Sequence, residues 1–231
     1  TEPTKVQELA IPTILNSKQD LVALAQTGTG KTGAFGLPLL HKIDPENKKV
    51  QAIVLSPTRE LAIQIAKDLK AYAKKLKGVK SVAVYGGSEI RTQIKALENG
   101  CQVVVGTPGR MLDLIRRKKL RVEAIQTLVL DEADEMLNMG FQEDLDAILA
   151  DTPSEKQTLL FSATMPKQMS SMAKKYMNNP AEIEVGERNS GSKDVEHQYY
   201  VVKASNRFET LKRLVDIHPS MYGIIFCRTR N

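Results

Sequence analysis

The chain has 231 residues, of which 42% are hydrophobic and 26% are charged, and its formal net charge is +6. This composition is typical of a globular protein with one domain and part of another, and it excludes a disordered or collagen-like chain. Residues 1–186 and 187–231 each carry a net charge of +3, so no basic tail explains the excess. Charge alone is therefore weak evidence for an anionic partner.

No run of 18 apolar residues is present, and the first residues lack the basic and apolar regions of a signal peptide. The two cysteines, Cys101 and Cys227, form no CxxC pair, and the three histidines are scattered. These features argue against a disulfide framework and a structural zinc site. We therefore expect a cytoplasmic protein without a membrane span.

Short apolar segments alternate with helical patterns along the first 186 residues. The predicted strands are rich in Val, Ile and Leu and lie at residues 21–24, 52–55, 82–85, 103–105, 127–130, 158–161 and 183–185. The predicted helices lie between them, at residues 31–40, 60–76, 89–97, 108–117, 141–150 and 166–177. Strands that are apolar on both faces are typical of a parallel sheet. The sequence thus predicts an α/β domain at residues 1–186, with a mostly parallel central sheet flanked by helices.

A polar, Gly/Ser-rich segment at residues 187–193 reads as a linker between domains. A new pattern follows it, with a strand predicted at residues 198–202, a helix at 207–218 and a strand at 224–227. One strand–helix–strand unit cannot enclose a core. We therefore expect residues 194–231 to be the incomplete start of a second domain.

A phosphate-binding pattern follows the first predicted strand and opens the first predicted helix. It reads Ala25-Gln26-Thr27-Gly28-Thr29-Gly30-Lys31-Thr32, which fits GxxxxGK[ST] except that Ala25 replaces the first glycine. Gly28 and Gly30 let backbone N–H groups curl around phosphate oxygens, and the helix start adds its positive dipole end. Lys31 would reach the β- and γ-phosphates, and the Thr32 hydroxyl would ligate Mg²⁺.

Carboxylates follow the strand predicted at residues 127–130, in the run Asp131-Glu132-Ala133-Asp134. Asp131 stands where the Mg²⁺-binding carboxylate of a P-loop protein belongs. Glu132 would orient or deprotonate the attacking water. Together with the P-loop, these acids predict a nucleotide-hydrolysing site.

Seven motifs, taken in their order along the chain, resemble those of a DEAD-box ATP-dependent RNA helicase, a bacterial-type member of superfamily 2. The resemblance covers the entire chain. The P-loop form with Ala25 is usual in that family, and Asp131 to Asp134 spell its name. The other matching motifs are Pro57-Thr58-Arg59-Glu60-Leu61-Ala62, Gly86-Gly87, Thr107-Pro108-Gly109-Arg110, Ser162-Ala163-Thr164 and Ile224-Ile225-Phe226-Cys227-Arg228-Thr229. The resemblance implies RecA-like domains, ATP and Mg²⁺ as cofactors, and RNA unwinding coupled to ATP hydrolysis.

The resemblance also implies roles at the nucleotide. Gln7, ahead of a helix, would read the adenine edge, since an amide offers a donor and an acceptor together. Nucleotide binding is assigned to Gln7, Ala25, Gln26, Thr27, Gly28, Thr29, Gly30, Lys31 and Thr32, and the metal to Thr32 and Asp131. Catalysis and its coupling to strand opening are assigned to Lys31, Asp131, Glu132, Asp134, Ser162 and Thr164. We expect Ser162 and Thr164 to act through hydrogen bonds to Asp134.

RNA is the partner that the resemblance implies, with contacts to its backbone rather than its bases. The residues assigned to the RNA path are Pro57, Thr58, Arg59, Gly87, Thr107, Pro108, Gly109 and Arg110. Protein partners would bind through flanking regions. Two basic runs, Lys74-Lys75 and Arg116-Arg117-Lys118-Lys119, are typical of solvated helix ends, although the second would also suit a longer RNA path.

Two alternatives stay open. One is an ATP-gated RNA clamp that unwinds little, and the other is a different P-loop nucleotidase such as a GTPase, against which stands the absence of an NKxD guanine motif. No residue in 194–231 matches the arginine-finger motif of the family. We therefore expect the 231-residue chain to bind adenine nucleotide but to hydrolyse ATP barely above background and to unwind no duplex.

Overall fold

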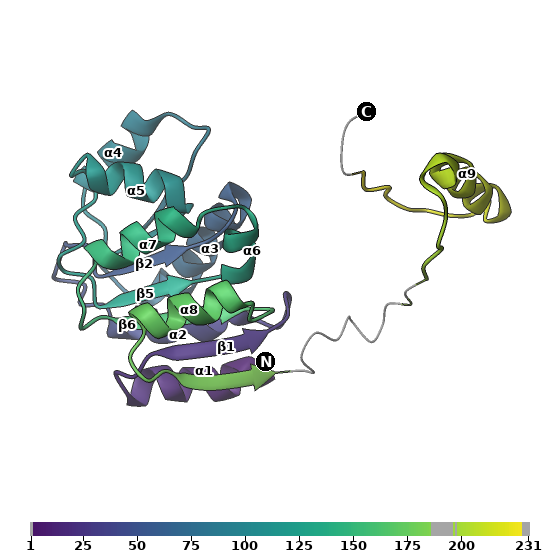
Figure 1. Ribbon diagram of the computed structural model, residues 1–231. Helices are drawn as coiled ribbons and strands as arrows, with labels where there is room; N and C mark the ends of the chain where they lie inside the picture. Colours follow the sequence, from purple (N-terminus) through teal and green to yellow (C-terminus); the bar gives the residue numbers. More distant parts are fainter. Residues whose placement is uncertain (1, 186–195, 197, 228–231) are drawn as a thin grey trace. The chain divides into compact units, whose positions relative to one another are not determined.

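The computed structural model describes residues 2–185, 196 and 198–227 (Figure 1). The chain divides into two compact units, Thr1–Ser190 and Gly191–Asn231, and each unit is described by itself. The linker predicted at residues 187–193 lies outside the described residues.

A seven-stranded, wholly parallel sheet forms the centre of the first unit, in the spatial order β3-β4-β2-β5-β6-β1-β7. Its strands are β1 (Leu21–Ala25), β2 (Ala52–Leu55), β3 (Ser81–Val84), β4 (Val103–Gly106), β5 (Thr127–Leu130), β6 (Gln157–Ser162) and β7 (Ala181–Val185). The strands β2, β4, β5 and β6 are buried along their whole length, as their continuous apolar sequences predict.

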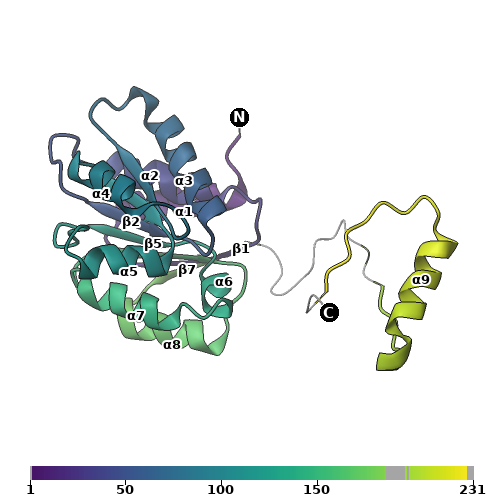
Figure 2. The ribbon, with the colours of Figure 1, turned by 90° about the horizontal axis from the view of Figure 1, so that it is seen from above.

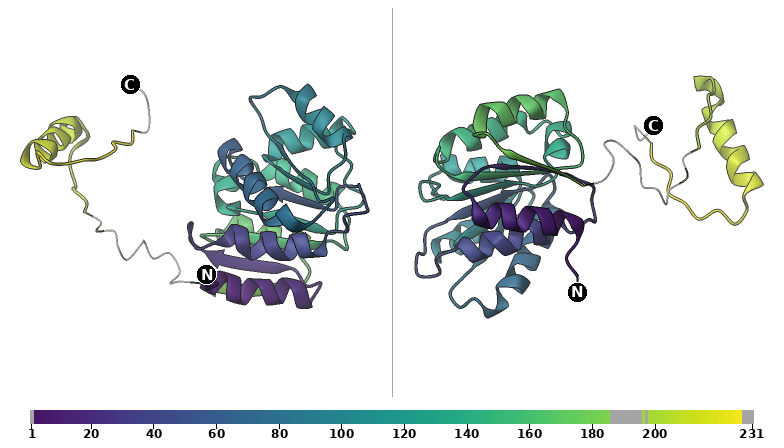
Figure 3. Two further views of the ribbon diagram at one scale, coloured as in Figure 1. Left: turned by 180° about the vertical axis from the view of Figure 1, so that it is seen from behind. Right: turned by 90° about the horizontal axis from the view of Figure 1, so that it is seen from below.

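Helices cover both faces of this sheet. They are α1 (Lys5–Asn16), α2 (Lys31–Lys42), α3 (Arg59–Tyr72), α4 (Ile90–Glu98), α5 (Pro108–Arg116), α6 (Ala133–Asn138), α7 (Gln142–Asp151) and α8 (Lys167–Tyr176), with a 3₁₀ turn η1 at Ala73–Lys75. Figure 2 shows α1, α2 and α3 on one side of the strands and α5, α7 and α8 on the other. On the first side α1 and α2 lie against each other (Figure 3).

The core is divided by the sheet into two apolar layers, because successive strand residues point to opposite faces. In β2, for example, Ala52 and Val54 join the layer under α1, α2 and α3, whereas Ile53 and Leu55 join the layer under α4 to α8. Phe35 of α2 and Phe161 of β6 are fully buried in the first layer with their ring centroids 5.4 Å apart. Burial of both faces fixes the sheet, and hence the positions of the loops at its ends.

The predicted α/β fold is confirmed in the first unit, with helix and strand ends shifted by a few residues. The pattern 60–76 becomes α3 followed by η1, and α1 and α6 were not among the predicted helices. In the second unit the helix predicted at 207–218 is present as α9 (Arg207–Ile217), after a 3₁₀ turn η2 at Ala204–Asn206.

The strands predicted at residues 198–202 and 224–227 are wrong, since neither segment is in a strand. A strand is held by hydrogen bonds to a neighbouring strand, and no described residue of the second unit supplies one. The apolar side chains of these segments stay exposed, for example Tyr199 at 88% and Phe226 at 89%.

No helix within the described residues is long and apolar enough to cross a membrane.

Candidate functional site

The parallel sheet brings the predicted site residues to one edge, because the carboxyl ends of all seven strands meet there. The P-loop follows β1, the acidic run follows β5, and Ser162 to Thr164 end β6, which lies between β1 and β5. The residues assigned to RNA follow β2, β3 and β4, the adjoining half of the same edge. The nucleotide and RNA assignments therefore fall on neighbouring halves of one edge.

The P-loop joins β1 to the first turn of α2. Gly28 and Gly30 have φ values of +78° and +89°, a region that glycine enters without the steric penalty of a side chain. The Thr29 hydroxyl donates to the Gln26 carbonyl over 2.8 Å, which closes the turn. Gly30 caps the N-terminus of α2, where free N–H groups and the helix dipole favour an anion.

Gln7 lies inside α1 rather than ahead of it, in the first turn of the helix. Its Nε2 donates to the Gly30 carbonyl over 3.0 Å, and its Oε1 accepts from the Thr4 N–H over 3.1 Å. A Cβ on Gly30 or on Gly33 would lie 2.7 Å from this Nε2. Gln7 thus ties α1 to the P-loop, with both ends of its amide already hydrogen-bonded.

Lys31 and Asp131 form the charged centre of the site. Lys31 is only 6% exposed, and its Nζ donates to the Ala25 carbonyl over 3.2 Å. Asp131 is 3% exposed, and burial raises its pKa to about 6, although the nearby positive charge of Lys31 works in the opposite direction. The Glu132 N–H donates to Asp131 Oδ1 over 3.1 Å. Asp131 is therefore a buried carboxylate that a further cation would stabilise.

The donor set fits a magnesium ion that is shared with a nucleotide. Mg²⁺ takes one or two carboxylates and completes its shell with phosphate oxygens and water. Asp131 and the half-buried Thr32 supply a carboxylate and a hydroxyl, and no group of three His, Cys, Asp or Glu residues is gathered to hold a metal anywhere in the described chain. The site thus suits a metal that arrives with phosphate.

Glu132 and Asp134 stand at the turn from β5 into α6. Glu132 has φ +51°, a left-handed conformation that is uncommon for a residue with a long side chain. The Asp134 N–H donates to Ser162 Oγ over 3.3 Å, and the N–H and Oγ1 of Thr164 donate to Asp134 Oδ2 over 2.9 and 2.8 Å. The expected hydrogen bonds between the two motifs are therefore present.

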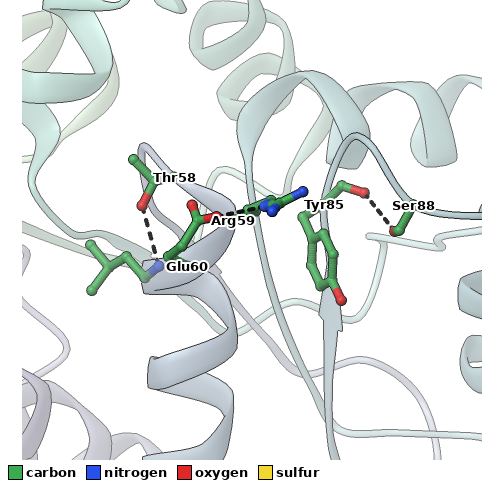
Figure 4. A network of polar contacts seen from close by, with 6 residues as sticks. Thr58, Arg59, Glu60, Tyr85 and Ser88 are labelled. Atoms are coloured by element: carbon green, nitrogen blue, oxygen red, sulfur yellow. Dashed lines mark hydrogen bonds and ion pairs between the residues drawn. The ribbon is translucent and has the colours of Figure 1, made fainter.

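The loops after β2 and β3 meet at Arg59. Figure 4 shows Arg59 between Glu60 and Tyr85, with Thr58 capping α3 and the Ser88 hydroxyl donating to the Tyr85 carbonyl. Arg59 is exposed, and its hydrogen bond with Glu60 (Nε to Oε1, 2.5 Å) raises the Arg59 pKa and lowers that of Glu60. This guanidinium can reach a ligand but starts from an ion pair.

Arg110, in the first turn of α5, is held from two sides. Its Nη1 donates to Gln93 Oε1 over 3.0 Å, and its Nη2 donates to the Ser88 carbonyl over 3.2 Å. The buried Gln93 also binds the backbone of Tyr85 through both ends of its amide. These contacts orient the Arg110 side chain and connect the loop after β3 to α5.

The other residues assigned to RNA lie beside these arginines. Gly87 has φ +75°, and a Cβ there would lie 3.6 Å from Arg59 Nη1. Thr107 and Pro108 begin α5, Gly109 is exposed in its first turn, and Pro57 is buried behind Thr58. The structure thus brings all eight residues to the ends of β2, β3 and β4.

Three supporting residues were missed in the sequence: Thr4, Ser88 and Gln93. Thr4 and Gln7 form a capping box at the start of α1, a signal readable from their three-residue spacing. Gln93 and Ser88 carry no such signal, because their contacts with Arg110 span 17 and 22 residues.

The family model of DEAD/DEAH box helicases matches residues 4–172, and the chain therefore belongs to this family. The chain is 48% identical over 229 residues to the DEAD-box ATP-dependent RNA helicase CshA of Streptococcus pneumoniae serotype 4. This alignment covers 99% of the chain and 43% of that protein. The ATP-dependent RNA helicase CshA of Listeria monocytogenes is 47% identical, with coverages of 99% and 44%.

Among solved structures, a DEAD box protein from Methanococcus jannaschii matches with a TM-score of 0.76 and 43% identity, over 99% of this chain and 61% of that one. This match confirms the RecA-like α/β fold. The chain spans less than half the length of the two curated relatives named above.

Proposed function

We propose that this chain is the nucleotide-binding part of an ATP-dependent RNA helicase, which binds ATP with Mg²⁺ and couples its hydrolysis to RNA binding and local strand separation. The observation that carries the proposal is the pairing of a P-loop with the buried Asp131, beside a hydrogen-bonded link from Asp134 to the end of β6. The names of the relatives, which specify a helicase, favour strand separation over a clamp that only holds RNA.

In this proposal the P-loop holds the phosphates. N–H groups of residues 26–32 and the start of α2 face the phosphate oxygens, and Lys31 turns from the Ala25 carbonyl to the β- and γ-phosphates. Asp131 and Thr32 would hold a Mg²⁺ ion, which would supply positive charge for the transferred phosphoryl group. Gln7 reads adenine, which requires its amide to exchange its present partners for the base.

Glu132 acts on water in the proposed reaction. It lies next to Asp131 at the start of α6, where its carboxylate orients the attacking water or accepts its proton. Asp134, Ser162 and Thr164 transmit the state of the nucleotide half to the rest of the edge. RNA lies along the adjoining half, on Pro57, Thr58, Arg59, Gly87, Thr107, Pro108, Gly109 and Arg110, and we place this work in the cytoplasm.

Nucleotide binding by point variants tests the proposal. Titration of the 231-residue chain with a fluorescent ATP analogue and Mg²⁺ should show binding that ATP displaces and GTP displaces poorly. Lys31→Ala should weaken binding roughly tenfold to a hundredfold, since it removes a charge-assisted contact. Glu132→Gln should bind like the parent chain but lose the residual single-turnover hydrolysis. Equal loss of binding in both variants would contradict the role given to Glu132.

A further inference from the structure

Eleven exposed lysines and arginines lie at the helix ends and in the loops that lead into the sheet, at the edge opposite the candidate site. We name this surface the basic edge; its members are Lys48, Lys49, Lys74, Lys75, Lys77, Lys80, Arg116, Arg117, Lys118, Lys119 and Arg121. They precede β2, β3 and β5, and these strands and β4 are neighbours in the parallel sheet. Segments that are far apart in the sequence therefore start their strands side by side.

Contacts between these loops show that they form one surface. The Lys80 N–H, just before β3, donates to Gln102 Oε1 just before β4, over 2.9 Å. A Cβ on Gly100, in the loop before β4, would lie 3.7 Å from the Cβ of Lys48 in the loop before β2. The loops before β2, β3 and β4 thus touch one another.

The run after α5 reaches the same surface. Lys119 Nζ lies 3.0 Å from Glu98 Oε1 at the end of α4, directly before the loop that contains Gly100. Arg110 lies in the first turn of α5, and Arg116 is the last residue of that helix, about 9 Å further along at 1.5 Å for each residue. The basic run at 116–119 therefore lies at the opposite end of α5 from the candidate RNA path.

The segments that form the basic edge carry a larger net positive charge than the whole domain. Segments 44–51, 73–80, 98–102 and 116–123 contain eleven basic and only four acidic residues, a net charge of +7. Residues 1–186 contain 25 basic and 22 acidic residues, a net charge of +3, so the remainder of the domain carries −4. The modest overall charge conceals a strongly polarised surface.

Few of these cations are neutralised by the protein itself. Arg117 pairs with Asp113 over 2.7 Å and Lys119 with Glu98 over 3.0 Å. The other nine have no ion-pair partner within the described parts of the chain. Nine unpaired like charges on adjoining loops repel one another, and a polyanion laid across them would relieve that repulsion.

The composition of the surface indicates which polyanion fits. Eight of the eleven residues are lysines, which are depleted at protein interfaces but are common phosphate contacts. We propose that the basic edge binds the phosphate backbone of RNA without reading its sequence, as a second contact surface that needs no nucleotide. This proposal goes beyond the RNA contacts that we propose at the carboxyl edge.

Charge-neutralising variants test the basic edge. The triple variant K74Q/K75Q/K77Q changes the loop before β3, and R116Q/K118Q/R121Q changes the loop before β5 without breaking an ion pair. The matched control K67Q/K70Q/K174Q removes the same charge from exposed lysines on α3 and α8 that have no ion pair within the described residues. Binding of a fluorescent single-stranded RNA is measured against salt concentration, without nucleotide, after circular dichroism has shown that each variant is folded.

Each basic-edge variant should weaken RNA binding about tenfold at low salt. Because three phosphate contacts are lost, the dependence of the binding constant on salt, plotted as log K against log salt concentration, should also become shallower by about 2. The control should change affinity less than twofold. K74R/K75R/K77R, which keeps the charge, should bind RNA like the parent chain. Acetylation of lysines with and without RNA should show protection of Lys74, Lys75 and Lys77.

Several results would overturn the proposal. Unchanged affinity and salt slope in both triple variants would do so, and so would a control that weakens binding as much as they do. Tighter binding of polyglutamate than of RNA of equal charge, lost in both triple variants, would point to an acidic protein instead. Lys31→Ala, which tests the nucleotide site, should leave this RNA binding intact, so the two proposals fail separately.

Discussion

Asp134 Oδ2 accepts two hydrogen bonds from Thr164, one from its N–H over 2.9 Å and one from its hydroxyl over 2.8 Å. Ser162 closes the arrangement, because its hydroxyl accepts from the Asp134 N–H and donates to the Thr164 carbonyl over 2.7 Å. The loops after β5 and β6 are thereby joined into one polar unit at the centre of the carboxyl edge. Movement of either loop must carry the other or break these bonds.

Replacement of Thr164 measures that link. Thr164→Val keeps the backbone donor and the shape but removes the hydroxyl, and we expect a loss of about 1 kcal/mol in the free energy of unfolding. Thr164→Ser keeps the hydroxyl and should lose much less. Urea titrations of the three proteins give the comparison. Because neither Thr164 nor Asp134 contacts the P-loop within the described hydrogen bonds, affinity for ATP should change little. An equal loss in the serine variant would contradict a role for this hydroxyl.

Gln7→Ala separates two roles of one amide. The bond from Gln7 to the Gly30 carbonyl positions the P-loop for any nucleotide, whereas adenine recognition concerns ATP alone. We expect GTP to weaken about threefold to tenfold, in line with the loss of one hydrogen bond, and ATP to weaken further. Competition titrations against a fluorescent nucleotide provide the measurement. If ATP and GTP weaken by the same factor, Gln7 only positions the P-loop.

The fold, and the gathering of the residues assigned to the nucleotide at one edge, were predictable, because a buried parallel sheet leaves few places for its strand ends. The order of strands then places Ser162 at the end of β6 and Asp131 and Lys31 after the ends of its two neighbours, β5 and β1. The partners of Arg110 were not predictable, since Gln93 reaches it only through the packing of α4 beside α5. The strand predicted at residues 198–202 is absent, because an apolar sequence alone cannot provide a neighbouring strand to pair with.

The basic edge shows a different limit of sequence reasoning. Counted along the chain, the charge is spread thinly over both halves. The strand order β3-β4-β2-β5 collects Lys48, Lys80 and Lys118 from loops that are 32 and 38 residues apart in the chain. Only the folded topology brings these loops together, so no one-dimensional charge pattern predicts the surface.

Asp131→Asn should make the nucleotide-free protein more stable at neutral pH. The folded-state pKa of Asp131 is about 6, above its ordinary value of 3.8, so the folded protein binds the proton more tightly than the unfolded chain. The ionised carboxylate then lowers stability as pH rises from about 4 to 6, by roughly 1–3 kcal/mol above that range. The variant removes this cost in the free energy of unfolding. It also removes the favourable interaction between the Asp131 carboxylate and Lys31, which reduces the gain.

Urea unfolding of Asp131→Asn and the parent chain from pH 4 to 8 checks this expectation. The difference in stability should be near zero at pH 4, grow up to pH 6 and then stay constant. The variant should also lose the Mg²⁺ dependence of nucleotide binding. A variant that is less stable at pH 7, or a difference that does not change with pH, would show that burial of Asp131 carries no such penalty.

Glu60→Gln tests whether the ion pair with Arg59 restrains RNA binding. Arg59 must exchange Glu60 for a phosphate oxygen, so removing the Glu60 charge should free its guanidinium. We expect RNA affinity to rise about twofold at low salt, with a slope of log K against log salt that is steeper by less than one phosphate contact. Arg59→Gln should have the opposite effect on both quantities.

The double variant should bind RNA like Arg59→Gln alone, since Glu60 then has no cation to restrain. Titrations of the four proteins with one RNA at several salt concentrations give this cycle. If Glu60→Gln strengthens binding equally with and without Arg59, the gain comes from lowered local negative charge, and Arg59 is not the group that meets RNA.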